Sequence, residues 1–554
     1  MNCMLKLIKT YELAEKKYHD FISSITKAQR WAFFSTLLCG LVAHIPAIAN
    51  DLLNHDSVGA LNADANQWLA GQGKWAASYL ISFLRGVLSV PSWFVLLGII
   101  FFSLSAVLIV RMFYVKSPIC AALIGCILVA NDSVVSMTLA YGTDYFGFCI
   151  FLTVLAVYIT RMYRFGYLLG IPLLVLCIGG YQPMIGIATS LFVLLCIVDA
   201  LDSRVPFKRI FLTGIQYIIV LLISGGVYYC ILRFLVAKGI IILSTYKNIG
   251  SLTSEGFSNL SRVLFFFKDS LQYTYKMMFG RFAVPYRIFN KLNILFGVST
   301  AITFTISVIR NKTYRSPLNL ITAFVLLFVI FPFSANLVDF LTQDEVVSRI
   351  MRYAIMLIYC VPLILCDNCI FRFVDRECPL EKNATQGVRY FVSTVCLAVC
   401  FITSLLVFNW CSLAHDAYGY VKIANNQMMA KCAVIMASVY DCEGYDYETP
   451  VVLIGSSPFP YFDDSGSATS WHSVTTIKNG TQGIYSASNT LYRTQLVERV
   501  LNARMGAGFA FVNSTDFYEE YTEQCDSMPI FPLDGSVTMV DGTIVVKLND
   551  VKIK

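Results

Sequence analysis

The sequence predicts an α-helical polytopic membrane protein of about eleven transmembrane helices, with a small C-terminal α/β domain outside the membrane. Of the 554 residues, 57% are hydrophobic and only 14% are charged, whereas soluble domains are typically about a quarter charged. The apolar residues also come in runs close to the roughly 20 residues that a helix needs to cross a bilayer. Composition and run length together exclude an ordinary soluble protein.

The spanning helices are predicted from the apolar runs in chain order, each bounded by polar or basic connections. They lie near 31–50, 92–111, 118–137, 145–163, 167–181, 183–199, 211–236, 289–309, 316–335, 351–366 and 389–409. Two short runs flank the sequence "GGYQP" (179–183). This stretch is either a simple Gly-Pro turn or a re-entrant element that dips into the membrane.

Every second connection between these spans is basic. The residues concerned are Arg111, Lys116, Arg161, Arg164, Arg204, Lys208, Arg209, Arg310, Lys312, Arg315, Arg372, Arg376 and Lys382. Because cytoplasmic loops carry an excess of Lys and Arg, these connections are predicted to be cytoplasmic. The N-terminus lies on the same side, and eleven spans place the C-terminus outside.

Three regions are predicted along the chain: a cytoplasmic amphipathic leader (1–30), a transmembrane domain with large outer loops (31–409) and an outer domain (410–554). The last region holds sixteen Asp and Glu against nine Lys and Arg, and it starts with a helical pattern. Strand-like pieces follow in "TPVVLIGSS", "GFAFVN" and the hairpin "GSVTMVDGTIVVKLN", whose Asp-Gly is a hairpin turn signal. Cys442 and Cys525 are free to pair there in an oxidising compartment, although the sequence does not show that they meet.

The interiors of the predicted spans contain almost no charge. His44 and Arg233 are the main exceptions, and both lie near the outer ends of their spans. Transporters and channels usually place ionisable residues along their path inside the membrane. Here the polar residues gather at the outer boundary, which favours chemistry at the lipid–water interface on a substrate with a lipid tail and a polar head.

The outer loops carry carboxylates and cations that suit such chemistry. The carboxylates are Asp51, Asp56, Asp64, Asp132 and Asp144, and the cations are Arg281, Arg287, Arg349 and Arg352. A carboxylate can act as general base toward a hydroxyl, and arginine can hold a phosphate. Sugar transfer from a lipid-phosphate donor requires both. The plainer alternatives are that the aspartates are solvated or cap helices, and that the arginines extend to the interface without binding a substrate.

Motifs of soluble enzymes are absent from the sequence. It has no G-x-x-x-x-G-K-[ST], no dinucleotide fingerprint, no H-E-x-x-H and no G-x-S-x-G. The predicted outer loops also lack the Asp-x-Asp spacing typical of metal-dependent nucleotide-sugar enzymes. We therefore predict metal-independent chemistry, with no cofactor and no nucleic-acid partner.

A set of short motifs in a fixed order resembles a known family. They are "NHDS" after the first span, "GQGKWAASYLISFLRG", the "YQP" turn, "SRIMRY" before a late span, and "HDAYGYVKIANNQMMAKCAVIMASV" after the last one. Together they resemble the serotype-converting O-antigen glucosyltransferases of phage and enterobacterial origin, the GtrII-type family, over most of the chain to about residue 460. The family pattern often has a paired Asp-Asp and a Gly-Arg-Trp; this chain has His55-Asp56-Ser57 and Gly73-Lys74-Trp75.

The resemblance implies a bacterial inner-membrane enzyme related to C-type glycosyltransferases. Such an enzyme takes glucose from undecaprenyl-phosphate glucose on the periplasmic side and transfers it to the lipid-linked O-antigen. A flippase and a polyprenyl-phosphate glucosyltransferase belong to the same pathway. Two alternatives remain: a related transferase that uses another sugar or acceptor, and a carrier or flippase for a lipid-linked sugar.

By position in the first outer loop, Asp56 inherits the family's catalytic carboxylate, and Asp51 and Asp144 are the alternatives for the base. The role of neutralising the departing lipid phosphate falls to the basic candidates. These are Lys74, Arg349 and Arg352, with Arg281 and Arg287 as further candidates.

Overall fold

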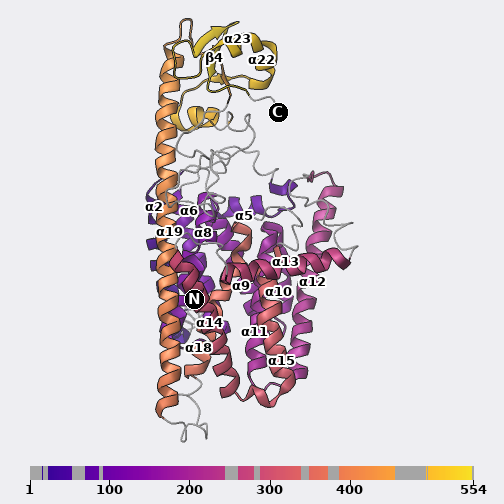
Figure 1. The fold of residues 1–554 in the computed structure, drawn as a ribbon. Helices are drawn as coiled ribbons and strands as arrows, with labels where there is room; N and C mark the ends of the chain where they lie inside the picture. The colour runs from indigo at the N-terminus through magenta and orange to yellow at the C-terminus, as the bar shows by residue number, and fades with distance from the viewer. Residues whose placement is uncertain are drawn as a thin grey trace, which may run out of the picture.

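The computed structural model contains a bundle of long helices and, beyond one end of it, a small domain built around a β-sheet (Figure 1). It describes residues 15, 23–50, 52, 69–85, 91–243, 260–279, 287–338, 349–371, 386–455, 495 and 497–551. The predicted fold class, a helical polytopic protein with a small C-terminal mixed domain, is confirmed.

Within the described residues, nine helices are long and apolar enough to cross a membrane, or ten if a bent pair counts as one span. The nine are formed by α2 (Lys27–Ala49), α6 (Pro91–Met112), α9 (Thr143–Met162), η1 and α11 (Gln182–Met184, Ile185–Leu201), α12 (Phe207–Ala237), α14 (Arg287–Arg310), α15, η4 and α16 (Pro317–Val325, Leu326–Ile330, Phe331–Ala335), η5 and α18 (Arg349–Cys360, Val361–Phe371) and α19 (Gln386–Tyr440). The fifth predicted span, 167–181, corresponds to α10 (Tyr167–Gly180), a shorter apolar helix of 14 residues. Shorter elements between the spans are α5 (Ala77–Leu84), α13 (Leu260–Phe279) and η3 (Thr313–Arg315).

The predicted span 118–137 is broken near the end predicted to face outward, which is called the outer end below. Its two parts, α7 (Pro118–Ala130) and α8 (Asp132–Leu139), meet at an angle of 41°. Asn131 lies at the break, where its side-chain amide donates to the Ile127 carbonyl and its side-chain oxygen accepts from the N–H groups of Ser133 and Val134. One side chain thus satisfies backbone groups at the end of one helix and at the start of the next.

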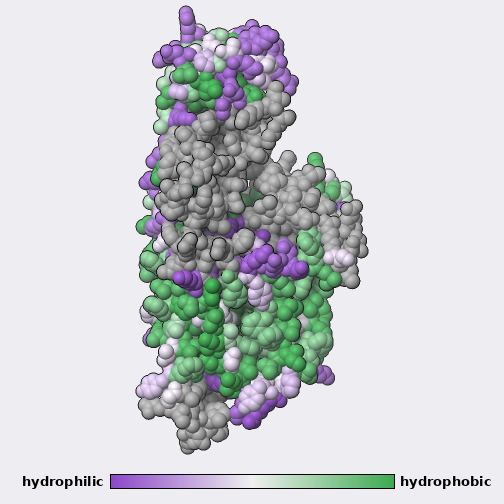
Figure 2. Space-filling model, viewed as in Figure 1, coloured by the Kyte–Doolittle hydropathy of each residue, from purple (hydrophilic) through white to green (hydrophobic). Residues whose placement is uncertain are grey.

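The basic connections that the structure describes lie at one end of the bundle; Arg372, Arg376 and Lys382 lie outside the described residues. Asp367 accepts from the backbone N–H groups of Lys116 and Ser117 at 3.0 and 2.6 Å, and Arg161 pairs with Asp199 at 2.7 Å. These contacts join the ends of helices that are apart in the sequence. On the face that Figure 2 shows, an apolar band crosses the bundle between polar residues at its two ends, as expected of a surface that faces lipid.

His44, the ionisable residue near the outer end of α2, is fully buried and joins three helices. Its Nε2 lies 2.9 Å from the carbonyl oxygen of Val129, and its Nδ1 lies 2.6 Å from the hydroxyl of Tyr418 in α19. Because a carbonyl only accepts, Nε2 carries the proton and Nδ1 accepts from the tyrosine. Both ring nitrogens are therefore satisfied without solvent.

Helix α19 is continuous for 55 residues, a length of about 80 Å. It combines the last predicted span with the helical start of the predicted outer region, and it runs from the bundle to the C-terminal domain (Figure 1). Beyond the bundle, Met428, Cys432, Ile435 and Val439 recur every three or four residues and are buried against the sheet. This apolar stripe explains why the helix continues after its sequence becomes more polar.

The C-terminal sheet has the strand order β2-β1-β4-β3. Strand β1 (Pro450–Ile454) pairs in parallel with β2 (Ala510–Phe511) and β4 (Thr543–Lys547), and β3 (Val537–Val540) forms an antiparallel hairpin with β4. At the hairpin turn, Asp541 and Gly542 both have positive φ, 45° and 75°, as a type I′ turn requires. All three predicted strand segments are confirmed. The helical pieces of the domain are η8 (Val500–Arg504), α22 (Ser514–Glu520) and α23 (Thr522–Ser527).

The two cysteines considered for a disulfide lie against opposite faces of this sheet. Val451 and Leu453 face the cluster that contains α19 and Cys442. The alternate residues of β1 face a second cluster, which contains Cys525. Because the sheet separates the two cysteines, they do not form a disulfide, and both are free thiols.

A close approach of two backbones holds α6 against α9. A Cβ added at Gly98 would lie 2.6 Å from both the carbonyl oxygen and the Cγ2 of Thr143. A Cβ at Gly226 in α12 would meet nothing within 4 Å. We expect Gly98→Ala to lower the melting temperature in detergent because the two helices must separate. Gly226→Ala should leave it unchanged or raise it slightly, since alanine favours a helix by about 1 kcal/mol over glycine. Equal losses in both variants would contradict this packing.

The C-terminal domain contains a carboxyl group that resists ionisation. Burial raises the pKa of Glu498 from 4.5 to about 7. Its stabilising contribution is therefore full below the pKa of the unfolded chain and is lost as the pH rises through about 7. We expect the melting temperature of the domain to fall more steeply between pH 5 and pH 8, roughly, in the wild type than in Glu498→Gln. Parallel pH profiles would contradict the shift.

Candidate active site

The end of the bundle opposite the basic connections carries most of the predicted site residues. Lys74, Asp144, Arg349 and Arg352 are described there. Arg287 is the first residue of α14, but its side chain is outside the described part. Asp51, Asp56 and Arg281 also lie outside the described residues.

Lys74 belongs to a tight turn before α5. The turn passes through Gly73, whose φ is +75°, and the Nζ of Lys74 donates to the side-chain oxygen of Gln72 at 2.7 Å. The same ammonium group lies 5.1 Å from the ring centroid of Tyr181. The side-chain amide of Gln182 donates to the backbone carbonyl of Gln72 at 2.8 Å. The basic residue of "GKW" is thus held against the "YQP" turn.

Glycine makes this contact between the two motifs possible. The N–H of Ala76 donates to the carbonyl of Gly179 at 2.9 Å, and a Cβ at Gly179 would lie 2.5 Å from the ring of Trp75. From α12, the hydroxyl of Tyr228 donates to the carbonyl of Gly73 at 3.0 Å. Backbone carbonyls therefore fix the turn, and the position of Lys74 does not depend on its own side-chain contacts alone.

Asp144, one of the three candidates for the base, lies in the first turn of α9 and is fully buried. Both its oxygens accept from Arg85, at 2.6 and 2.8 Å, and the guanidinium also donates to the Tyr141 carbonyl. The ring of Phe94 lies 5.1 Å from the guanidinium carbon. A carboxylate engaged through both oxygens is poorly placed to take a proton from a substrate, so this geometry favours a structural role.

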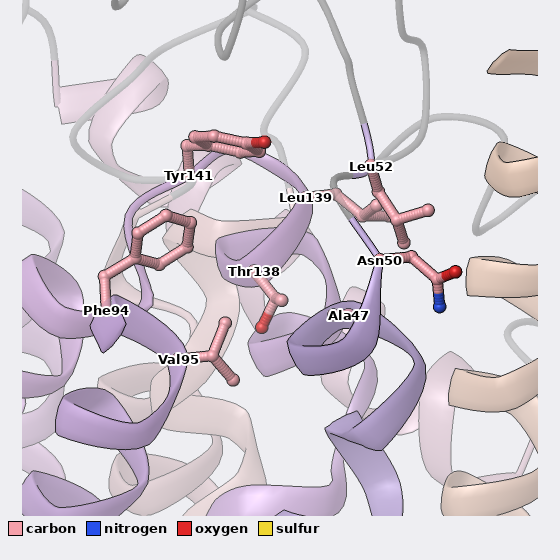
Figure 3. Close-up of a pocket in the computed structure, with 8 residues that line it drawn as sticks. All are labelled: Ala47, Asn50, Leu52, Phe94, Val95, Thr138, Leu139 and Tyr141. Carbon is pink, nitrogen blue, oxygen red and sulfur yellow. The ribbon is translucent and has the colours of Figure 1, made fainter. Parts of the chain in front are cut away.

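A small pocket lies beside this ion pair, between the outer ends of α2, α6 and α8 (Figure 3). Its lining residues are Ala47, Asn50, Leu52, Phe94, Val95, Thr138, Leu139 and Tyr141. In Figure 3 the rings of Phe94 and Tyr141 lie on one side, with centroids 4.9 Å apart, and Asn50 and Leu52 lie on the other. Asn50 and Leu52 precede and follow Asp51 in the sequence, so the first outer loop starts at the rim of this pocket.

Arg349 and Arg352 open η5, which has 3₁₀ geometry over its 12 residues. Residues i and i+3 of a 3₁₀-helix lie directly above one another, about 6 Å apart along the axis, so the two arginines share one edge. Arg349 pairs with Asp132 at 2.9 Å. Arg352 donates to the side-chain oxygen of Asn336 at 3.0 Å, and its guanidinium lies 3.5 Å from the ring centroid of Tyr273.

The turn that holds Lys74 (the lysine turn) and the edge of η5 that carries Arg349 and Arg352 (the arginine row) are connected by the start of α11, which contacts η5. The Cα of Gly186, one turn after the "YQP" segment, faces Ala354 of η5, because a Cβ at Gly186 would lie 3.4 Å from the Ala354 side chain. Arg85 lies within the quoted motif "GQGKWAASYLISFLRG" but was not among the predicted site residues, and neither were Tyr273 and Asn336. No spacing in the sequence links any of the three to the residues it contacts. No group of three or more His, Cys, Asp or Glu among the described side chains is placed to hold a metal ion.

The part of the chain that forms this region matches a known protein family. The family model described as glucosyl transferase GtrII matches residues 45–365, more than half of the 554 residues. The chain belongs to this glucosyltransferase family. No curated protein and no solved structure matches the chain.

The GtrII match contains the described residues of the candidate site. It starts in the last turn of α2, at the pocket, and ends within α18, so it contains Lys74, Asp144 and both arginines of η5. The protein is accordingly a multi-pass membrane glucosyltransferase, which requires a glucose donor and an acceptor. The whole of α19 and the whole C-terminal sheet lie outside the matched region.

Removing one partner of the Arg85–Asp144 pair should destabilise this GtrII enzyme strongly. The side chains are 8% and 0% exposed, and a buried charge left alone typically costs about 3–5 kcal/mol. We expect Arg85→Met and Asp144→Leu each to lower the melting temperature, and the Arg85→Met/Asp144→Leu double variant to lower it less than the sum of the single changes. Additive losses would contradict a direct coupling between the two residues.

Proposed function

We propose that this enzyme transfers glucose from undecaprenyl-phosphate glucose to the lipid-linked O-antigen on the periplasmic side of the bacterial inner membrane. The observation that carries the proposal is the gathering of Lys74, Arg349 and Arg352 at the end of the bundle opposite the basic connections. The phosphate of a membrane lipid lies at this depth, and guanidinium and ammonium groups are suited to bind it.

The orientation is part of this proposal. The connections rich in Lys and Arg lie at the opposite end of the bundle from the candidate site. The excess of basic residues on the cytoplasmic side then gives a cytoplasmic N-terminus, a periplasmic site and a periplasmic C-terminal domain. A flippase that delivers the lipid-linked glucose to this side, and a polyprenyl-phosphate glucosyltransferase that makes it, are the implied partners.

The proposed reaction is a single displacement at the anomeric carbon. Asp56 removes the proton from the acceptor hydroxyl, whose oxygen attacks the anomeric carbon on the face opposite the lipid phosphate. The bond between that carbon and the phosphate oxygen breaks, the electron pair leaves with the phosphate, and the configuration inverts. Lys74, Arg349 and Arg352 stabilise the departing phosphate, and Arg281 and Arg287 are additional candidates for this role. Asp51 is the alternative base.

The acceptor is a polysaccharide, which requires an open approach to the site. The C-terminal domain lies beyond the outer end of the bundle, at the far end of α19 (Figure 1). We propose that residues 410–554 shape the acceptor side of the site, while the transmembrane region 31–409 binds the donor and residues 1–30 form a cytoplasmic leader.

Substitution of the proposed base tests this function. We expect Asp56→Asn to reduce glucose transfer by about 10²- to 10⁴-fold, because a positioned general base contributes a factor of that size. The measurement is transfer of labelled glucose from undecaprenyl-phosphate glucose to the lipid-linked O-antigen in proteoliposomes. Asp64→Asn, in the same loop, is the matched control and should retain activity.

Two results would contradict the proposal. Full activity of Asp56→Asn would exclude this residue as the base. Movement of labelled lipid across the vesicle membrane without an acceptor, together with no transfer when the acceptor is present, would indicate a carrier for the lipid-linked sugar.

A further inference from the structure

Helix α13 lies across the outer end of the bundle, nearly at right angles to the spans (Figure 1). Its exposed side carries the apolar residues Leu264, Phe265 and Phe279 together with the cations Lys268 and Lys276, whereas Phe266, Ser270 and Thr274 are buried against the bundle. A helix with this pattern is suited to the plane of the membrane interface. It therefore lies at the depth where the headgroup of a lipid donor would bind.

Three hydroxyl groups attach α13 to the helix that runs from α15 to α16. Ser270 donates to the carbonyl of Asn336 at 2.8 Å, Thr274 donates to that of Pro332 at 3.1 Å, and Tyr275 donates to that of Phe328. Pro332 has no N–H and cannot donate to the carbonyl of Phe328, four residues earlier. The hydroxyl of Tyr275 donates to this carbonyl instead, so α13 also satisfies a backbone acceptor of the spanning helix.

On the same helix, Tyr273 contacts the arginine row of η5. The guanidinium carbon of Arg352 lies 3.5 Å from the ring centroid of Tyr273, within direct stacking distance. The N–H donors of a guanidinium all lie in its plane, and an aromatic ring occupies only one face. Stacking therefore fixes the plane of the guanidinium, and the hydrogen bond to Asn336 at 3.0 Å lies in that plane.

We propose that Tyr273 is a positioning residue that holds Arg352 in the orientation needed to bind the phosphate of the lipid donor. This inference rests on the proposed function, in which Arg352 contacts that phosphate. Arg349, one turn before Arg352 on the same edge, is fixed in turn by Asp132 at 2.9 Å. The two arginines are thus oriented by side chains from separate elements, α13 and α8.

The test uses the full-length enzyme in nanodiscs. Two quantities are measured: the Kd for undecaprenyl phosphate, which cannot react, and KM and kcat for undecaprenyl-phosphate glucose. We expect Tyr273→Leu to raise Kd and KM by roughly 5- to 30-fold, the equivalent of one cation–π contact, with a smaller change in kcat. Tyr273→Phe keeps the ring and should restore both constants.

Tyr314→Leu is the matched control. Arg315 lies 5.9 Å from the ring centroid of Tyr314, so the contact is of the same type but lies at the opposite end of the bundle. This variant should bind like the wild type. If Tyr273→Leu does not fold, pentafluorophenylalanine at position 273 replaces it, because that ring keeps its shape but loses its negative face.

A double-mutant cycle with Arg352→Ala separates this inference from the proposed function. In the Arg352→Ala background, Tyr273→Leu should have no further effect on Kd. Additive effects, or a wild-type Kd for Tyr273→Leu while Arg352→Ala weakens binding, would overturn the role of Tyr273 alone. A wild-type Kd for Arg352→Ala would overturn the phosphate role of Arg352 itself, and the role of Tyr273 with it.

Discussion

The absence of water inside a bilayer is the constraint on which this structure depends. A polar group within the hydrocarbon region must find its partner in the protein. His44 therefore uses both ring nitrogens, toward Val129 and Tyr418. The carbonyl of Phe328 cannot accept from Pro332, which has no N–H, and accepts from the hydroxyl of Tyr275 instead. Most of the remaining charge lies at the two ends of the bundle, where it forms ion pairs or faces water.

The same constraint gives the buried ion pair of Arg85 and Asp144 its importance. Taking both charges out of water is costly, and the pair is retained only because its geometry is bidentate and the Tyr141 carbonyl accepts a further hydrogen bond. It ties the residue after α5 to the first turn of α9, beside the pocket at the start of the first outer loop. The ion pair thus fixes the end of α5 relative to the start of α9 at the edge of the candidate site.

The sequence predicts the spans well because lipid-facing residues must be apolar over a nearly fixed length. Runs of apolar residues therefore report helices directly, and the hairpin at Asp541-Gly542 was equally visible because its backbone demands particular residues. The sequence is less informative where one side chain changes the course of a helix. Asn131 bends a predicted span, and α19 continues past 410 because its stripe of buried residues lies beyond the membrane. The role of Asp56 remains a prediction.

The candidate site illustrates why its residues could be only partly predicted. Lys74, Arg349 and Arg352 were found as basic residues in outer loops, but the groups that orient them come from the turn at 181–182 and from α8, α13 and the end of α16. No motif spacing connects these segments, because their proximity is set by the packing of whole helices. Rigid attachment matters for a transferase, since holding reacting groups in the productive geometry removes much of the entropic barrier. Here the cations proposed to bind the donor are held by a backbone turn and by stacked or paired side chains, which reduces the freedom that they would lose on binding a lipid phosphate.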